Sequence, residues 1–113
     1  MGLGKTRQAI VGIQIAAPTG MVLVVCPASL KLNWRREIKM VDPAAKIEVL
    51  GVADGAQNDP RWVILNYDLL ARNADRLHGI QWAGVILESS FHQEQQPADL
   101  TLPQAAWCLQ YCP

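Results

Sequence analysis

Short apolar runs alternate along the chain with segments whose apolar positions recur at helical spacing. Met21 to Cys26 is a continuous apolar run, typical of a strand buried on both faces of a parallel sheet. Further strands are predicted over 46–50, 61–65 and 84–87, and helices over 5–17, 30–40 and 67–77. This alternation predicts an α/β fold, a doubly wound layer of parallel strands and helices.

Local signals place the boundaries between these elements. Pro18-Thr19-Gly20 predicts a turn before the first strand, and residues 51–60 form a polar loop. Ser29 is predicted to be the N-cap of the second helix. The apolar stripe of that helix contains Trp34, for which a place in the core is favoured over stacking on a nucleic-acid base.

The pattern stops after Leu87. Residues 88–113 are rich in Gln, Ser, Pro and Ala and have no periodic apolar positions. We therefore expect one incomplete domain over residues 1–87 and an irregular, poorly ordered C-terminal tail over residues 88–113.

Composition indicates an ordinary soluble domain. Half of the 113 residues are hydrophobic, 18% are charged and the formal net charge is zero. Neutral charge argues against strong nonspecific attraction to nucleic acid, although Lys31, Arg35, Arg36 and Lys39 form a local basic stretch. We expect no signal peptide, no membrane span and a cytoplasmic location. Cys26, in its apolar run, is expected to be a buried, reduced thiol.

The first six residues carry candidate chemistry. Gly4-Lys5-Thr6 before an apolar helix and a buried strand matches the second half of a phosphate-binding loop. Gly2 and Gly4 allow backbone N–H groups to approach phosphate oxygens, and the helix N-terminus adds partial positive charge. Lys5 would contact the β- and γ-phosphates of ATP, and the Thr6 hydroxyl would ligate Mg²⁺.

Four segments resemble, in order and spacing, the motifs of Swi/Snf-type DNA-dependent ATPases. They are Met1-Gly2-Leu3-Gly4-Lys5-Thr6 with Gln8-Ala9-Ile10; Pro27-Ala28-Ser29-Leu30 with Asn33-Trp34 and Glu37; Trp62 to Asp68; and Trp82 to Leu87. The resemblance implies a RecA-like, P-loop first lobe that binds ATP and Mg²⁺. It also implies that Pro27, Ala28 and Ser29 lie along the backbone of double-stranded DNA. Asn66 and Tyr67 either belong to that site or only close the strand-to-helix turn.

The resemblance ends where the family has an Asp-Glu-Ala-His box. In that family the Asp holds Mg²⁺ and the Glu polarises the attacking water, but this chain continues as Glu88-Ser89-Ser90. Glu88 is the one candidate catalytic remnant, and the isolated His92 has no assigned role.

A shift in reading frame offers one explanation for this break. One choice of codons for residues 89–95, read one nucleotide later, encodes Ala-His-Phe-Ile-Lys-Asn, and residues 104–107 similarly yield Lys-Leu-Leu-Gly. Both strings resemble the family. The hypothesis is that residues 88–113 are out of frame, in which case Cys108 and Cys112 are accidental and form no zinc site.

The preferred interpretation is an ATP-binding fragment of a Swi/Snf-type translocase or helicase-like enzyme, with negligible turnover by itself. It is expected to lack the strand before the loop, the carboxylate box and the second RecA-like lobe. One alternative is a small P-loop kinase or other nucleotide-binding protein, for which a second carboxylate and a substrate lid are not found. Another is a non-functional truncated product.

Overall fold

The computed structural model describes residues 2–51, 60–88 and 105–111, with side chains placed for residues 6–51 and 60–88. Its helices are α1 (Gly2–Ala16), α2 (Lys31–Val41), α3 (Tyr67–Arg72) and α4 (Ala74–His78), with a 3-10 turn η1 (Ala28–Leu30) before α2. Its strands are β1 (Met21–Val25), β2 (Ile47–Val49), β3 (Trp62–Leu65), β4 (Trp82–Glu88) and β5 (Ala105–Tyr111).

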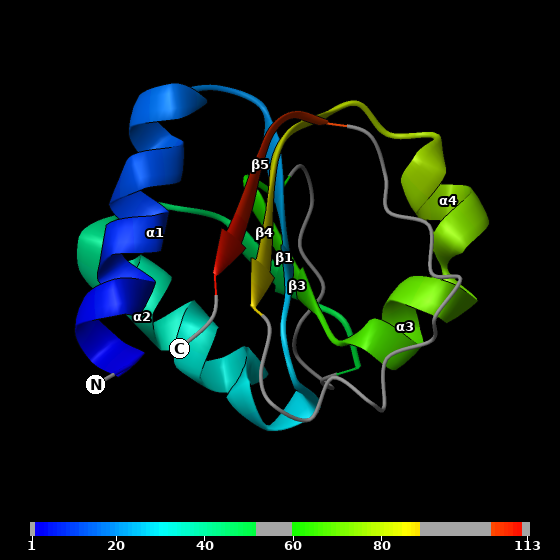
Figure 1. The fold of residues 1–113 in the computed structure, drawn as a ribbon, viewed down its shortest axis with the longest axis horizontal. Helices are drawn as coiled ribbons and strands as arrows, with labels where there is room; N and C mark the ends of the chain where they lie inside the picture. The colour runs from blue at the N-terminus through cyan, green and yellow to red at the C-terminus, as the bar shows by residue number, and fades with distance from the viewer. Residues whose placement is uncertain (1, 52–59, 89–104, 112–113) are drawn as a thin grey trace.

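The strands form one parallel sheet with the order β2-β3-β1-β4-β5. Helices α1 and α2 lie on one side of the sheet and α3 and α4 on the other (Figure 1). The chain leaves β1 through α2 toward β2, and leaves β3 through α3 and α4 toward β4. The predicted doubly wound α/β architecture with parallel strands is therefore confirmed.

The core follows from the alternation of side chains along the central strand. Val22, Val24 and Cys26 pack with α1 and α2, whereas Leu23 and Val25 pack with α3 and α4. All five side chains are fully buried. A central strand covered on both faces needs a continuous apolar run, which is why this segment was recognisable in the sequence.

The turn before β1 depends on a glycine. Gly20 has a φ of 98°, and a Cβ at this position would lie 2.8 Å from the Cβ of Ala83. A side chain at Gly20 would therefore meet both an unfavourable backbone conformation and a steric clash. The predicted Pro18-Thr19-Gly20 turn is confirmed and sets the connection between α1 and β1.

Two predicted helix boundaries differ from the structure. Helix α1 begins at Gly2 rather than Lys5, because glycine tolerates helical geometry at a cost of only about 1 kcal/mol relative to alanine. The predicted helix over 67–77 is two helices, since Asn73 leaves helical geometry between them and its side-chain amide donates to the Leu69 carbonyl at 2.8 Å. Both differences arise from single backbone positions that hydrophobic periodicity does not resolve.

The predicted tail is not irregular throughout. Glu88 is the last residue of β4, and Ala105–Tyr111 forms β5, which pairs in parallel with β4 along the edge of the sheet. The prediction of an irregular segment was therefore wrong for residues 105–111. A parallel edge strand is formed by backbone hydrogen bonds, so it does not require the periodic apolar pattern that was sought. Residues 89–104, including His92, lie outside the described residues.

Candidate nucleotide and DNA site

The candidate residues gather at the carboxyl edge of the parallel sheet. The arrowheads of β4 and β5 point to the edge at which α1 and α2 begin (Figure 1). β1 is followed there by Pro27 and η1, β3 by Asn66, and β4 ends at Glu88. Ligands of doubly wound sheets bind outside the carboxyl ends of the strands, so the fold places the candidate motifs in a suitable position.

The segment predicted to bind phosphate forms the first turn of α1. The backbone of Gly2, Gly4, Lys5 and Thr6 is helical, and the first turn contains no acidic side chain. The N–H groups and the positive end of the helix dipole are therefore not neutralised by a carboxylate within that turn, which suits an anionic ligand. Thr6 is 4% exposed, whereas the side chain of Lys5 lies outside the described residues.

Arg7, which follows Thr6, connects α1 to α2. Its Nε donates to Oε1 of Glu37 at 2.8 Å, and its Nη2 contacts the Met40 sulfur at 3.4 Å. The Glu37 side chain is 2% exposed and that of Arg7 is 48% exposed. The second turn of α1 is thereby attached to the middle of α2 by a mostly buried carboxylate.

The Pro27-Ala28-Ser29 segment forms the turn that precedes α2. Pro27 is half-buried, Ala28 and Ser29 are exposed, and the Leu30 N–H donates to the Pro27 carbonyl at 2.9 Å. Ser29 lies inside η1, and the cap positions of η1 and α2, Pro27 and Leu30, make no side-chain cap hydrogen bond. The predicted Ser29 N-cap is therefore wrong, because the 3-10 turn provides a backbone acceptor instead.

Lys31 does not belong to an exposed basic surface. It is 8% exposed, and its Nζ donates to the Leu50 carbonyl at 2.8 Å and to Oδ1 of Asn66 at 3.3 Å. This ammonium group joins the residues that follow β2 and β3. Through this hydrogen bond Asn66 takes part in the strand-to-helix turn after β3, which is one of the two roles predicted for it.

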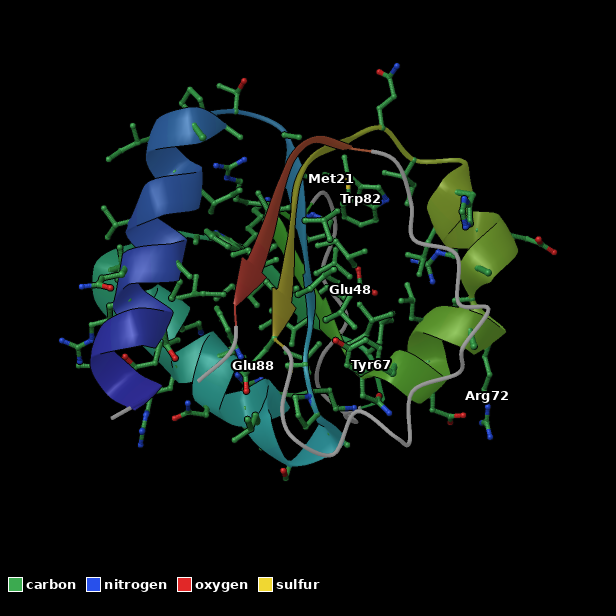
Figure 2. The ribbon with its side chains drawn as sticks, viewed as in Figure 1. Met21, Glu48, Tyr67, Arg72, Trp82 and Glu88 are labelled. Atoms are coloured by element: carbon green, nitrogen blue, oxygen red, sulfur yellow. The ribbon has the colours of Figure 1, made fainter. Side chains whose placement is uncertain are left out.

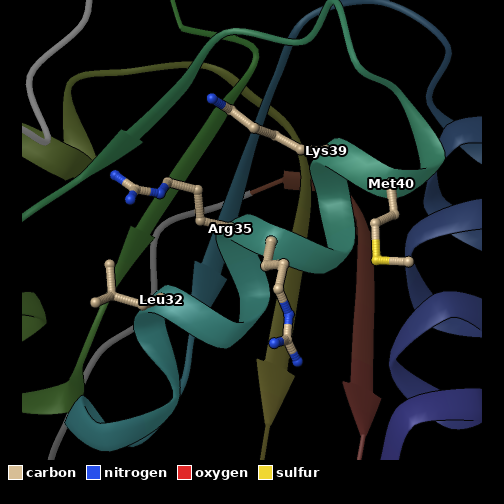
Figure 3. Close-up of a pocket in the computed structure, with 5 residues that line it drawn as sticks. Leu32, Arg35, Lys39 and Met40 are labelled. Atoms are coloured by element: carbon tan, nitrogen blue, oxygen red, sulfur yellow. The ribbon is translucent and has the colours of Figure 1, made fainter.

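The remaining basic side chains of that stretch lie on the outer face of α2 (Figure 3). Together with two exposed apolar side chains they line an open groove of about 490 Å³. The lining residues are Leu32, Arg35, Arg36, Lys39 and Met40. Because Glu37 of the same helix points inward to Arg7, the outer face carries positive charge without a carboxylate from α2 itself.

Glu88 lies at the carboxyl end of β4, on the side of the sheet that faces α2 (Figure 2). It is 3% exposed, and its Oε1 accepts a hydrogen bond of 2.5 Å from Nε1 of Trp34. Burial raises the pKa of Glu88, and the Trp34 hydrogen bond opposes that rise in pKa. On the α3 side, the Tyr67 hydroxyl donates to the Glu88 backbone carbonyl at 3.2 Å.

Trp34 is a core residue, as predicted. It is fully buried and packs in the cluster between the sheet and helices α1 and α2. Its ring is therefore enclosed by the protein, and its indole N–H is directed to a carboxylate rather than to solvent.

Cys26 is the cysteine whose side chain the structure describes. Cys26 is a fully buried free thiol, as predicted, and burial raises its pKa far above the ordinary range. Within residues 2–51, 60–88 and 105–111, no group of three or more His, Cys, Asp or Glu residues could hold a metal ion. The side chains of Cys108 and Cys112 lie outside the described ones, so the prediction that they form no zinc site stays a prediction.

Comparison with known proteins finds helicase-type relatives. The chain is 26% identical over 110 residues to chromodomain-helicase-DNA-binding protein 1-like of Danio rerio, covering 85% of this chain and 11% of that protein. It is 30% identical over 107 residues to DNA annealing helicase and endonuclease ZRANB3 of Bos taurus, covering 87% of this chain and 10% of that protein. The chain thus spans about a tenth of the length of these curated relatives. No protein-family model matches it.

Solved structures give the same assignment for the fold. The SWI2/SNF2 ATPase core of Sulfolobus solfataricus in complex with dsDNA matches 99% of this chain and 26% of that chain, with a TM-score of 0.80 and 21% identity. The SWI2/SNF2 ATPase core domain of the same organism matches 99% of this chain and 25% of that chain, with a TM-score of 0.75 and 22% identity. By fold the chain is similar to SWI2/SNF2 ATPase cores, and by sequence it is similar to helicase-type proteins. Because these matches cover 99% of the chain, the similarity of fold extends over nearly all of it.

The long-range contacts of several residues at this edge of the sheet could not be predicted from the sequence. Arg7 and Lys31 make contacts to residues 30 and 19 positions away, and Tyr67 reaches a backbone atom 21 positions away. Glu37 was noticed only as part of a motif. A buried acidic residue inside the apolar stripe of α2 is the signal that could have indicated a partner for it.

In the part of the chain that the structure describes, no helix is both long and apolar enough to cross a membrane.

Proposed function

We propose that this chain binds ATP and Mg²⁺ through the first turn of α1. The observation that supports this most directly is the Gly-Leu-Gly-Lys-Thr segment, which forms a helix start without acidic residues at the carboxyl edge of a RecA-like sheet. Backbone N–H groups of Gly2 and Gly4 and the Lys5 ammonium would bind the phosphates, and Thr6 would ligate the metal ion. When bound, Mg²⁺ neutralises phosphate charge; the chain itself supplies donors and one hydroxyl.

Hydrolysis by this chain alone is proposed to be negligible. Glu88 ends β4, where the resemblance to Swi/Snf-type ATPases implies paired carboxylates, but its carboxylate is buried and engaged by Trp34. A carboxylate so placed is poorly suited to polarise a water molecule, and the preceding residue of β4 is Leu87, which cannot ligate a metal ion. The loss of such groups typically costs two or more orders of magnitude in rate.

Titration of the purified protein with a fluorescent ATP analogue and Mg²⁺ tests the nucleotide site. We expect saturable binding that Lys5→Ala abolishes and that the exposed-surface control Lys39→Ala leaves unchanged. Binding without Lys5 dependence would place the nucleotide outside the first turn of α1 and favour another kind of nucleotide-binding protein. No saturable binding at all would leave the non-functional product as the remaining interpretation.

We further propose that double-stranded DNA binds at the Pro27-Ala28-Ser29 turn and the basic outer face of α2. The turn is exposed at Ala28 and Ser29, and Arg36 and Lys39 lie on the adjoining helix face. One structural relative was solved as an ATPase core in complex with dsDNA. Because the whole chain is neutral, such binding requires a local concentration of positive charge, which this face provides.

The salt dependence of duplex binding measures the contribution of each side chain. Each phosphate contact removed reduces the slope of log affinity against log salt by about 0.9. We expect Arg36→Gln and Lys39→Gln each to reduce the slope by roughly that amount. Arg72→Gln, an exposed residue of α3 paired with Asp68, is the matched control and should have no effect. Equal slopes for all variants would exclude the α2 face as the DNA contact.

The proposal that residues 88–113 are out of frame concerns the coding sequence rather than the fold. Strand β5 does not decide it, since backbone pairing with an open sheet edge places few demands on side chains. Sequencing the coding DNA tests it. Early stop codons in the shifted frame after codon 87 would refute the proposal, and an open frame with family-like residues would support it.

A further inference from the structure

Two motif residues of α2, Trp34 and Glu37, point inward and have polar partners in other elements. The partner of Trp34 is Glu88 at the end of β4, and the partner of Glu37 is Arg7 in α1. A packing role for the helix would need only apolar side chains at these positions. The buried carboxylate of Glu37, which loses its hydration, therefore needs a different explanation.

The position of Arg7 suggests that explanation. Arg7 directly follows Thr6, so its backbone belongs to the same end of α1 as the proposed phosphate-binding turn. The 2.8 Å contact from its Nε to Glu37 attaches this end of α1 to a helix that packs on the same face of the sheet. We propose that Glu37 is a positioning residue: through Arg7 it fixes the first turns of α1 for nucleotide binding.

The geometry of the pair fits positioning better than stability. The Arg7 side chain is 48% exposed, so much of its charge remains hydrated whether or not Glu37 is present. The Glu37 side chain is 2% exposed and carries the larger cost of burial. Replacing a buried ion pair by apolar residues of similar size is often neutral or stabilising, and loss of Glu37 alone leaves only the half-exposed Arg7 cation, which water can solvate. Stability and nucleotide affinity should therefore respond in different directions when Glu37 is replaced.

The test is Glu37→Met, which keeps the volume of the side chain and removes its charge. We expect unfolding stability equal to or above that of the wild type, together with roughly 10-fold weaker binding of the Mg²⁺–ATP analogue. We also expect faster amide hydrogen exchange at residues 6–10 of α1 and unchanged exchange in α3. Arg72→Met, which removes the exposed Asp68–Arg72 pair on the other face of the sheet, is the control and should alter neither measurement.

Two variants of Arg7 test whether the ion pair between Arg7 and Glu37, rather than the Glu37 carboxylate by itself, is needed for nucleotide binding. Arg7→Lys retains a cation able to reach Glu37 and should keep most of the wild-type affinity, whereas Arg7→Met should lose about as much affinity as Glu37→Met. Affinity in Glu37→Met equal to that of the wild type, with equal exchange in α1, would overturn the inference. The inference rests on the proposed nucleotide site: absence of nucleotide binding by the wild type refutes both, whereas binding that is insensitive to Glu37 refutes the inference alone.

Discussion

Glu88 lies at the end of β4, at the carboxyl edge of the sheet, but its carboxylate accepts a buried hydrogen bond from Trp34. Burial disfavours the charged form and raises the pKa of Glu88. The folded state therefore binds the proton more tightly than the unfolded state, in which the pKa is about 4.3.

This sign leads to a prediction for stability as a function of pH. The stabilising contribution of protonated Glu88 is fully present below the unfolded-state pKa and is lost as pH rises through the higher folded-state pKa. In Glu88→Gln that loss disappears, because the amide can still accept from Trp34 and carries no charge. We expect this variant to be more stable at neutral pH by on the order of 1 kcal/mol. Urea unfolding between pH 4 and 8 measures the difference.

Trp34→Phe provides the control for this pH effect. It keeps an aromatic ring in the core but removes the hydrogen bond that lowers the pKa of Glu88. The pH dependence should therefore become steeper, opposite to the change in Glu88→Gln. Identical pH profiles for the wild type and Glu88→Gln would show that another group controls the transition.

At the scale of secondary-structure elements, a substitution before α2 can distinguish two roles of Ser29, capping of the helix and binding of DNA. Ser29 is exposed and lies inside η1, and the α2 cap position, Leu30, makes no side-chain cap hydrogen bond. An N-cap serine would cost about 1 kcal/mol on replacement by alanine. We expect Ser29→Ala to change unfolding stability by less than about 0.5 kcal/mol and to weaken duplex DNA binding. A loss of about 1 kcal/mol or more in unfolding stability would instead indicate that Ser29 caps α2.

The connection from α1 to β1 provides a second test at this scale. Gly20→Ala introduces a Cβ 2.8 Å from that of Ala83 at a φ of 98°, so we expect destabilisation of about 1–3 kcal/mol. Gly12→Ala is the matched control, because a Cβ at this helical position meets no atom within 4 Å. It should stabilise the protein by up to about 1 kcal/mol. Thermal unfolding of both variants measures the contrast, and equal effects would contradict a left-handed turn at Gly20.

The elements themselves could largely be predicted, whereas their ends and their long-range contacts could not. The buried runs that became β1, β3 and β4 are determined by the need to cover both faces of a parallel sheet with apolar side chains. The start of α1 at Gly2 and the break at Asn73 depend on single backbone geometries. Lys31 belongs to a local basic stretch of the sequence, but its hydrogen-bond partners follow β2 and β3, which the sequence does not reveal.

At the scale of the whole molecule, β5 is expected to affect the stability of the sheet and its tendency to aggregate. β4 pairs with β1 on one side and with β5 on the other, so β5 covers a backbone edge that would otherwise be open. Unpaired edges of apolar strands promote aggregation. A chain ending at residue 104 lacks β5 and should therefore unfold more easily and aggregate at lower concentration.

Amide hydrogen exchange gives the most specific measurement of this effect. Amides of β4 that donate toward β5 should exchange faster in the shortened chain, whereas amides of β1 and β3 should change little because their pairing is retained. A chain ending at residue 111 is the control, since it retains the whole strand. Equal exchange and equal solubility in the two chains would mean that residues 105–111 do not stabilise the sheet.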